Sequence, residues 1–209
     1  SSLSFMGQGF SLSPSTVFDI NDGGVIGPVG DVTPFPGTPF DFGGSTVNIN
    51  DGGLFDPDSS AESMVSNIIL NVEGGSVGTN FKARVGSQVN ISRGSVGVGF
   101  FALDGSTVNI SGGSVGGFFN AESGSLVNIS GGSVGNNFDA LDGSAVNITG
   151  GEFVLNGASV SSIDSVGSND VLSGVLADGN VFIFTGFQSD ELAPGTTTLN
   201  TVTVAPADT

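Results

Sequence analysis

A seven-residue signature of the form Gly-Ser-x-Val-Asn-Ile-Ser/Thr recurs along the chain at a fixed interval of 19 residues. Upstream of these copies, related segments keep an apolar-polar-apolar core but are more widely spaced. A repeat this short and regular predicts a solenoid, in which each copy buries its apolar face only by stacking on its neighbours. The seven copies begin near Ser15, Gly44, Asn67, Gly86, Gly105, Gly124 and Gly143.

Each copy has the pattern of three short strands joined by three corners. Val89 and Ile91 flank Asn90, which is the alternation expected of a strand with one buried face. Further apolar positions follow, and glycine-rich turns separate the apolar segments. The predicted fold class is therefore all-β: a right-handed, single-stranded parallel β-helix of about seven coils with a small antiparallel C-terminal cap. Coils spaced about 4.8 Å apart would stack Phe81, Phe100, Phe119 and Phe138 inside the rod.

The ends of the chain depart from the repeat and predict caps. Residues 1–14 are expected to form an N-terminal cap or pairing strand, and residues 162–209 a C-terminal β cap. Within that cap we expect a hairpin around Asp178-Gly179 and a last strand over residues 197–204. The β-helix itself spans residues 15–161, with insertions at 27–42 and 54–62.

Composition excludes several classes of function. The chain has no Cys and no His, so thiolate and imidazole metal sites, disulfides and Ser-His-Asp triads cannot form. Three Lys and Arg against 20 Asp and Glu give a net charge of −17, which repels phosphate backbones and anionic lipids. We therefore expect that the chain does not bind nucleic acid and does not insert into a membrane. We also expect that it requires no cofactor.

The repeat resembles a known family type. Segments such as Val108-Asn109-Ile110-Ser111-Gly112-Gly113-Ser114-Val115-Gly116 are similar to the coils of extracellular bacterial right-handed parallel β-helix surface proteins, of the broader pectin-lyase-like fold. The resemblance covers roughly residues 15–161. It implies a β-solenoid at the cell surface or outside the cell, with a signal peptide already removed or outside this sequence. No catalytic motif of a particular lyase family is present to carry over.

The asparagines of the repeat form a regular outer column headed by Asp19. If Val and Ile point inward, the Asn side chains point outward and stack as an amide ladder that keeps the coils in register. An alternative is that this flat polar face binds a glycan or crystalline surface, including ice. The ladder residues are Asn48, Asn71, Asn90, Asn109, Asn128 and Asn147.

The three basic residues lie close together in the sequence. Lys82 and Arg84 are expected to project from one outer face, and Arg93 from a different corner. A polyuronate lyase needs a base and a cation that neutralises the substrate carboxylate, so a lyase would use these three residues. The competing interpretation is that Lys82 and Arg84 pair with the acidic insertion around Asp56, Asp58 and Glu62.

Acidic residues gather at one corner of the first two coils. Asp22 and Asp51 occupy the same repeat position, and Asp19 lies nearby in sequence. Ca²⁺ prefers several oxygen ligands, so these three residues are the candidate site for it. Solvated acidic turns are the competing interpretation.

The function that we expect is that of a secreted, non-catalytic structural or adhesive surface protein. Its partners would be further copies of itself or cell-surface and matrix glycans. We expect filaments to form by end-to-end strand pairing, with Phe5 and Phe10 at one end and Val202 and Val204 at the other. The alternative is a polysaccharide-active β-helix, either a uronate lyase or a glycan-binding module.

Overall fold

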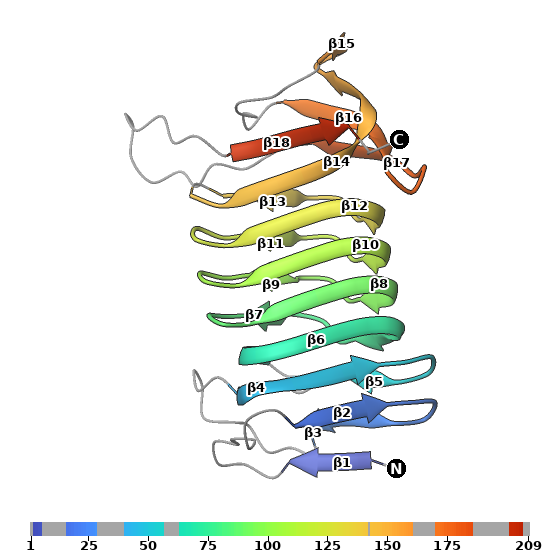
Figure 1. The fold of residues 1–209 in the computed structure, drawn as a ribbon, viewed down its shortest axis with the longest axis vertical. Coiled ribbons are helices and arrows are strands. Elements are labelled where there is room, and N and C mark those ends of the chain that lie inside the picture. The colour runs from blue at the N-terminus through green and yellow to red at the C-terminus, as the bar shows by residue number, and fades with distance from the viewer. Residues whose placement is uncertain are drawn as a thin grey trace.

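The chain folds into a rod of stacked β coils in a computed structural model (Figure 1). The structure describes residues 2–5, 16–28, 40–56, 63–141, 143–160, 170–185 and 201–206. The first strand lies at one end of the rod and the last strand near the other. None of the described residues forms a helix long and apolar enough to cross a membrane.

One side of the rod is a parallel sheet that contains the Val-Asn-Ile segments, which we call the ladder sheet. Its strands pair in register, so that Asn109 lies between Asn90 and Asn128. The strands are β2 (Val17–Ile20), β4 (Phe40–Ile49), β6 (Ser63–Val77), β8 (Gln88–Val96), β10 (Thr107–Val115), β12 (Leu126–Val134) and β14 (Ala145–Leu155).

Two further sides complete each coil. The second side combines β3 (Val25–Pro28) and β5 (Leu54–Phe55) with the later halves of the long ladder strands, where Ser95 pairs with Ser114. The third side consists of short strands, seen at the back of the rod in Figure 1. They are β7 (Phe81–Ala83), β9 (Phe101–Ala102), β11 (Phe119–Ala121) and β13 (Phe138–Ala140). The predicted fold class, an all-β parallel solenoid, is confirmed.

The described solenoid forms about five turns, slightly fewer than the seven coils expected. The last copy is incomplete as a coil because β14 turns into the cap after Thr149 and pairs antiparallel with β16. In the first two copies, much of each insertion lies outside the described residues, namely 29–39 and 57–62.

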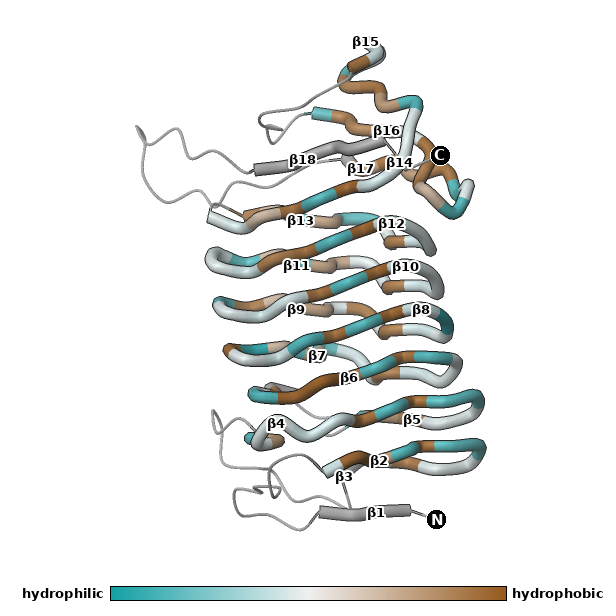
Figure 2. Tube along the Cα trace, in the orientation of Figure 1, coloured by the Kyte–Doolittle hydropathy of each residue, from teal (hydrophilic) through white to brown (hydrophobic). Residues whose placement is uncertain are grey.

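The core is a set of columns, which in the inner coils are built from equivalent repeat positions. Inward Val and Ile side chains alternate with outward polar ones along the ladder strands, as the alternating colours of Figure 2 show. The predicted phenylalanine stack is confirmed, with ring centroids of Phe100 and Phe119 4.8 Å apart and nearly parallel. Burying one phenylalanine contributes about 1.5–3 kcal/mol, so the stack is a major part of the stability. The whole column is Phe42, Phe55, Phe81, Phe100, Phe119, Phe138 and Phe184.

The corner before each short strand of the third side takes a left-handed backbone conformation in four successive coils. The residues there are Asn80, Gly99, Phe118 and Asn137 in successive coils, with φ between 55° and 78°. Asn and Gly adopt this conformation readily, whereas a bulky side chain does not. Phe118 is therefore a strained exception, and its side chain is 56% exposed.

The N-terminal strand caps the second side of the rod. β1 (Ser2–Phe5) pairs in parallel with β3, so that Phe5 lies opposite Pro28. The rest of the predicted pairing segment, including Phe10, lies outside the described residues.

At the C-terminal end, the predicted hairpin is confirmed. β16 (Val171–Leu176) and β17 (Val181–Thr185) are antiparallel, and their turn contains Gly179 at φ 87°. β16 pairs with the later half of β14, which also pairs with the short strand β15 (Ala158–Ser159). At the hairpin turn, the carboxylate of Asp178 accepts the Gly132 N–H at 2.6 Å, which fastens the cap to the penultimate ladder strand.

The last strand differs from the antiparallel cap that was expected. β18 (Thr201–Pro206) pairs in parallel with β14 and adds one more rung to the ladder sheet. Val202 lies opposite Val146 and Val204 opposite Ile148, the register of the repeat itself. The alternation Thr-Val-Thr-Val matches that of Ala-Val-Asn-Ile, which explains why this segment fits the ladder sheet.

Adjacent phenylalanines provide a test of this packing. Phe119→Ala removes a fully buried ring from the stack and should lower the free energy of unfolding by about 3–5 kcal/mol. Phe118→Asn, one residue earlier, should leave stability unchanged or raise it, because Asn tolerates the left-handed corner. Equilibrium denaturant unfolding followed by circular dichroism measures both. Equal destabilisation by the two substitutions would contradict this core.

Candidate functional site

The most regular polar feature is the column of asparagines on the ladder sheet. The side-chain amide N–H of each Asn donates to the amide oxygen of the Asn one coil closer to the N-terminus. The distances are 2.7 Å from Asn71 to Asn48 and 2.8 Å for the four bonds above it. Every bond in the series has the same direction along the rod.

Asp19 determines that direction. It occupies the first rung, where its carboxylate accepts the Asn48 amide N–H at 2.7 Å. An ionised carboxylate can only accept, so Asn48 must turn its N–H₂ toward Asp19 and its oxygen toward Asn71. Each following Asn then takes the same orientation, because the oxygen of the Asn below it needs a donor. The aligned amide dipoles have their positive ends toward Asp19, which the negative carboxylate stabilises.

The neighbouring serines are also bonded within the sheet. The hydroxyls of Ser111 and Ser130 each lie 3.4 Å from a backbone carbonyl of the preceding coil, which they use as acceptor. The Asn and Ser groups of this face therefore bond mainly to adjacent coils. The net contribution of one hydrogen bond to stability is about 0.5–1.5 kcal/mol, so the repeated bonds together hold the coils in register.

The three basic residues do not converge on one place. Lys82 lies in β7, with Arg84 just after it, on the third side of the rod. Lys82 Nζ lies 5.1 Å from the centroid of the Phe101 ring, a cation–π contact with the next coil. Arg93 lies in β8 beyond the Asn position and is exposed at a different corner. Of the acidic partners suggested for Lys82 and Arg84, Asp58 and Glu62 lie outside the described residues.

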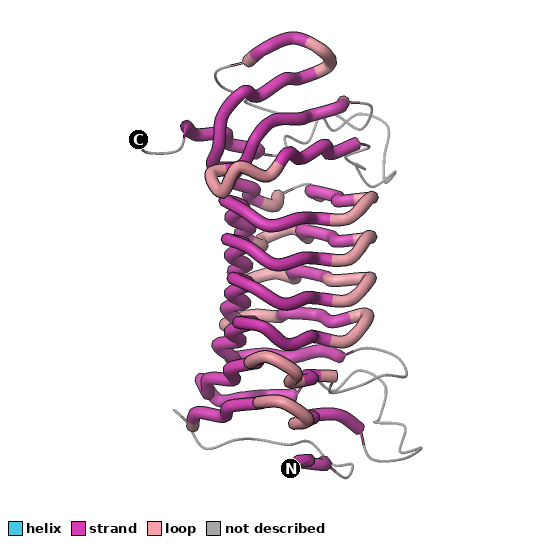
Figure 3. Tube along the Cα trace, turned by 90° about the vertical axis from the view of Figure 1, so that its right-hand side faces the viewer, coloured by secondary structure: helices cyan, strands magenta, loops and turns pink. Residues whose placement is uncertain are grey.

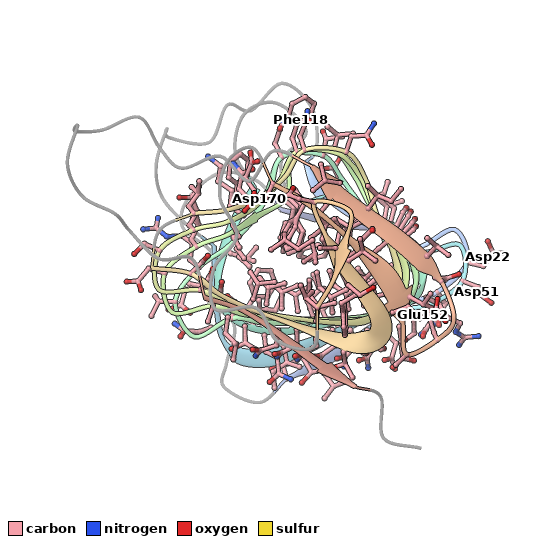
Figure 4. All side chains as sticks on the ribbon, turned by 90° about the horizontal axis from the view of Figure 1, so that it is seen from above. Asp22, Asp51, Phe118, Glu152 and Asp170 are labelled. Atoms are coloured by element: carbon pink, nitrogen blue, oxygen red, sulfur yellow. The ribbon has the colours of Figure 1, made fainter. Side chains whose placement is uncertain are left out.

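The three acidic residues proposed for Ca²⁺ also separate. Asp19 belongs to the ladder, whereas Asp22 and Asp51 lie at the turn that follows it, at the outer edge in Figure 4. The Asp51 carboxylate lies against Gly74 of the next coil, where an added Cβ would overlap it. Among the described residues, no group of three or more acidic side chains could hold a metal ion. Calcium binding at Asp19, Asp22 and Asp51 stays a prediction.

Asp41 has a local electrostatic role in β4. Its carboxylate accepts the Gly43 backbone N–H at 2.9 Å and the Asn67 side-chain N–H at 3.0 Å. These two hydrogen bonds, the backbone one first, hold the pKa of Asp41 below its usual value. They join the bend at Gly43 to the next coil, which is a structural rather than a catalytic arrangement.

Phe118 is a candidate that sequence reasoning missed. It projects outward from its corner in the view down the rod (Figure 4), and Val98, from the preceding coil, is 49% exposed. The repeat contains the signal, since Asn80, Gly99 and Asn137 occupy the equivalent position and Phe118 is the exception. Its left-handed conformation is visible only in the structure.

Comparison of the chain with protein-family models, with curated proteins and with solved structures gives no match. The fold and the arrangement of its side chains are therefore the evidence for function.

The hydrogen bonding of the ladder can be tested at one inner rung. In Asn109→Asp, an ionised carboxylate would face the Asn90 oxygen without a donor, and we expect a loss of about 1–3 kcal/mol at neutral pH. Protonation restores a donor, so the pKa of this carboxyl should be raised in the folded state. The loss should therefore shrink as the pH falls below the raised pKa.

The matched control is Asp19→Asn, which keeps an acceptor for Asn48 and should change stability little. Unfolding in denaturant at pH 7 and at pH 4 measures both substitutions. An Asn109→Asp variant as stable as the original protein at pH 7 would contradict a hydrogen-bonded amide ladder.

Proposed function

We propose that the protein is a secreted, non-catalytic structural rod of the cell surface or extracellular matrix, which associates end to end with further copies of itself. The observation that carries this proposal is the Asn ladder, whose polar groups bond to one another along the rod. These bonds hold successive coils in register and stiffen the rod. The repetition of the same amide hydrogen bond in every coil of the ladder supports a structural role.

Three sets of interactions run along the rod and support its stiffness. Backbone hydrogen bonds join each coil to the next. Side-chain amide hydrogen bonds join the same coils on the outer face, and contacts between phenylalanine rings join them in the core. All three act between the same pairs of coils. Separating any two coils therefore breaks all of them together, which suits a stiff spacer under tension.

The positions of the basic residues favour this function over a lyase. A lyase would need its base and its carboxylate-neutralising cation around one substrate site. Lys82 instead lies over the Phe101 ring, and Arg93 lies at another corner.

Self-association of the full chain tests the proposal. Sedimentation velocity over a range of protein concentrations should show species larger than the monomer, and electron microscopy should show particles extended along one axis. A strictly monomeric particle at millimolar concentration would contradict end-to-end association.

Phe118 favours a second candidate function, binding of a glycan at the left-handed corner. Its side chain is 56% exposed, and its backbone has φ 58°, a conformation that costs free energy for a bulky residue. Strain of this kind tends to persist where a side chain has a role beyond stability. An exposed aromatic ring offers an apolar surface for the C–H groups of a sugar.

A panel of neutral and uronate polysaccharides, tested by isothermal titration calorimetry, examines this second candidate. Phe118→Asn should weaken any binding at least about tenfold, since exposed aromatic rings carry much of such affinity. Asn137→Gly, at the same corner one coil away, is the control and should leave binding unchanged. Binding that survives Phe118→Asn would contradict the assignment.

A further inference from the structure

The C-terminal hairpin has one buried face and one exposed apolar face. Phe182 and Phe184 are buried, and the Phe184 ring lies 5.0 Å from that of Phe138, so this face closes the end of the core. Side chains at alternate positions point the other way. Val181 and Ile183 are 73% and 64% exposed, and Val171 is 40% exposed.

These exposed side chains form one patch. The half-buried Val175 pairs directly with the exposed Val181, and Ser173 with Ile183, so the side chains of each pair lie on the same face. We call Val171, Val175, Val181 and Ile183 the cap face. Its side chains lie on the face of the hairpin opposite Phe184, and the end of the rod that carries β14 to β18 is seen at the top of Figure 3.

The charge around the cap face is unusual for this protein. The chain has a net charge of −17, yet β16 and β17 contain no charged residue. Asp170 and Asp178 lie just outside the two strands. Exposed apolar strands normally carry charged residues that prevent association, and these two lack them. An uncharged end face is where two strongly acidic copies could approach with least repulsion.

We propose that the cap face binds the cap face of a second copy, so that two rods join at their C-terminal ends about a twofold axis. This inference rests on the proposed self-association and names its surface and its partner. A twofold axis places the same patch on both sides, so apolar side chains meet apolar side chains. It is a contact distinct from the expected pairing of the terminal strands β1 and β18, each of which pairs with one strand of its own chain, β3 and β14.

The size and charge of the surface predict how this contact responds to conditions. The patch contains only four large side chains, so the dimer should be weak and concentration-dependent. Each copy has a charge of −17, so long-range repulsion opposes association. Raising the salt concentration should therefore strengthen the dimer.

A cysteine cross-linking experiment tests the geometry with the full chain. The protein has no Cys, so Val181→Cys and Ile183→Cys each introduce a single thiol. Two such thiols near a twofold axis can form a disulfide if their Cα atoms come within about 7 Å. Under mild oxidation, at least one of the two variants should form covalent dimers. Val85→Cys, which is similarly exposed at 60% on a coil corner, is the control and should stay monomeric.

Sedimentation velocity with charged substitutions gives the second measurement. Ile183→Lys should weaken self-association at least about tenfold, whereas Val85→Lys should not, because buried apolar contacts dominate such interfaces. Circular dichroism checks that both variants fold. Association unaffected by Ile183→Lys, with no cross-linking at either cap position, would overturn the cap-face inference and leave the proposed function standing. Absence of association in the original protein would overturn both.

Discussion

Register between successive coils is the constraint on which the rest of this structure depends. A coil of this solenoid has no core of its own, because its inward Val, Ile and Phe side chains are covered mainly by the coils on either side. The 19-residue period places chemically identical positions above one another, so the Asn109 amide meets the Asn90 amide while the Phe119 ring meets the Phe100 ring. A one-residue slip would break both contacts and turn apolar side chains outward.

The same regularity makes the ends the exceptional parts of the molecule. The inner rungs are interchangeable, but the first rung has no Asn below it, and there Asp19 provides a group that only accepts hydrogen bonds. At the other end β18 adds a rung, and the hairpin covers the last phenylalanines of the column. The features that point to association therefore lie at a terminus, whereas the middle of the rod supplies length and stiffness.

Repetition explains how much could be predicted from the sequence. Each column is supported by several independent copies, so the strands, the corners, the phenylalanine stack and the Asn column all follow from the alignment of the repeat with itself. The caps occur once each, and their contacts join distant residues, such as Asp178 with Gly132. The parallel pairing of β18, the exposure of Ile183 and the strain at Phe118 consequently required the structure. The candidate lyase residues and calcium ligands were chosen because they are close in sequence or share a repeat position. In the folded coil, Arg93 lies at a different corner from Lys82, and Asp19 lies on the ladder sheet whereas Asp22 lies at the turn after it.

A ladder of amides, whose common direction is set by Asp19, holds the coils in register. Neutron diffraction from crystals of the deuterium-exchanged protein tests it directly, because deuterium distinguishes the amide nitrogen from the oxygen. We expect deuterium on the atom of every ladder Asn that faces the N-terminal neighbour, and none on the Asp19 carboxylate. Amides of mixed orientation along the inner rungs, or a ladder that runs in the opposite direction, would contradict this account.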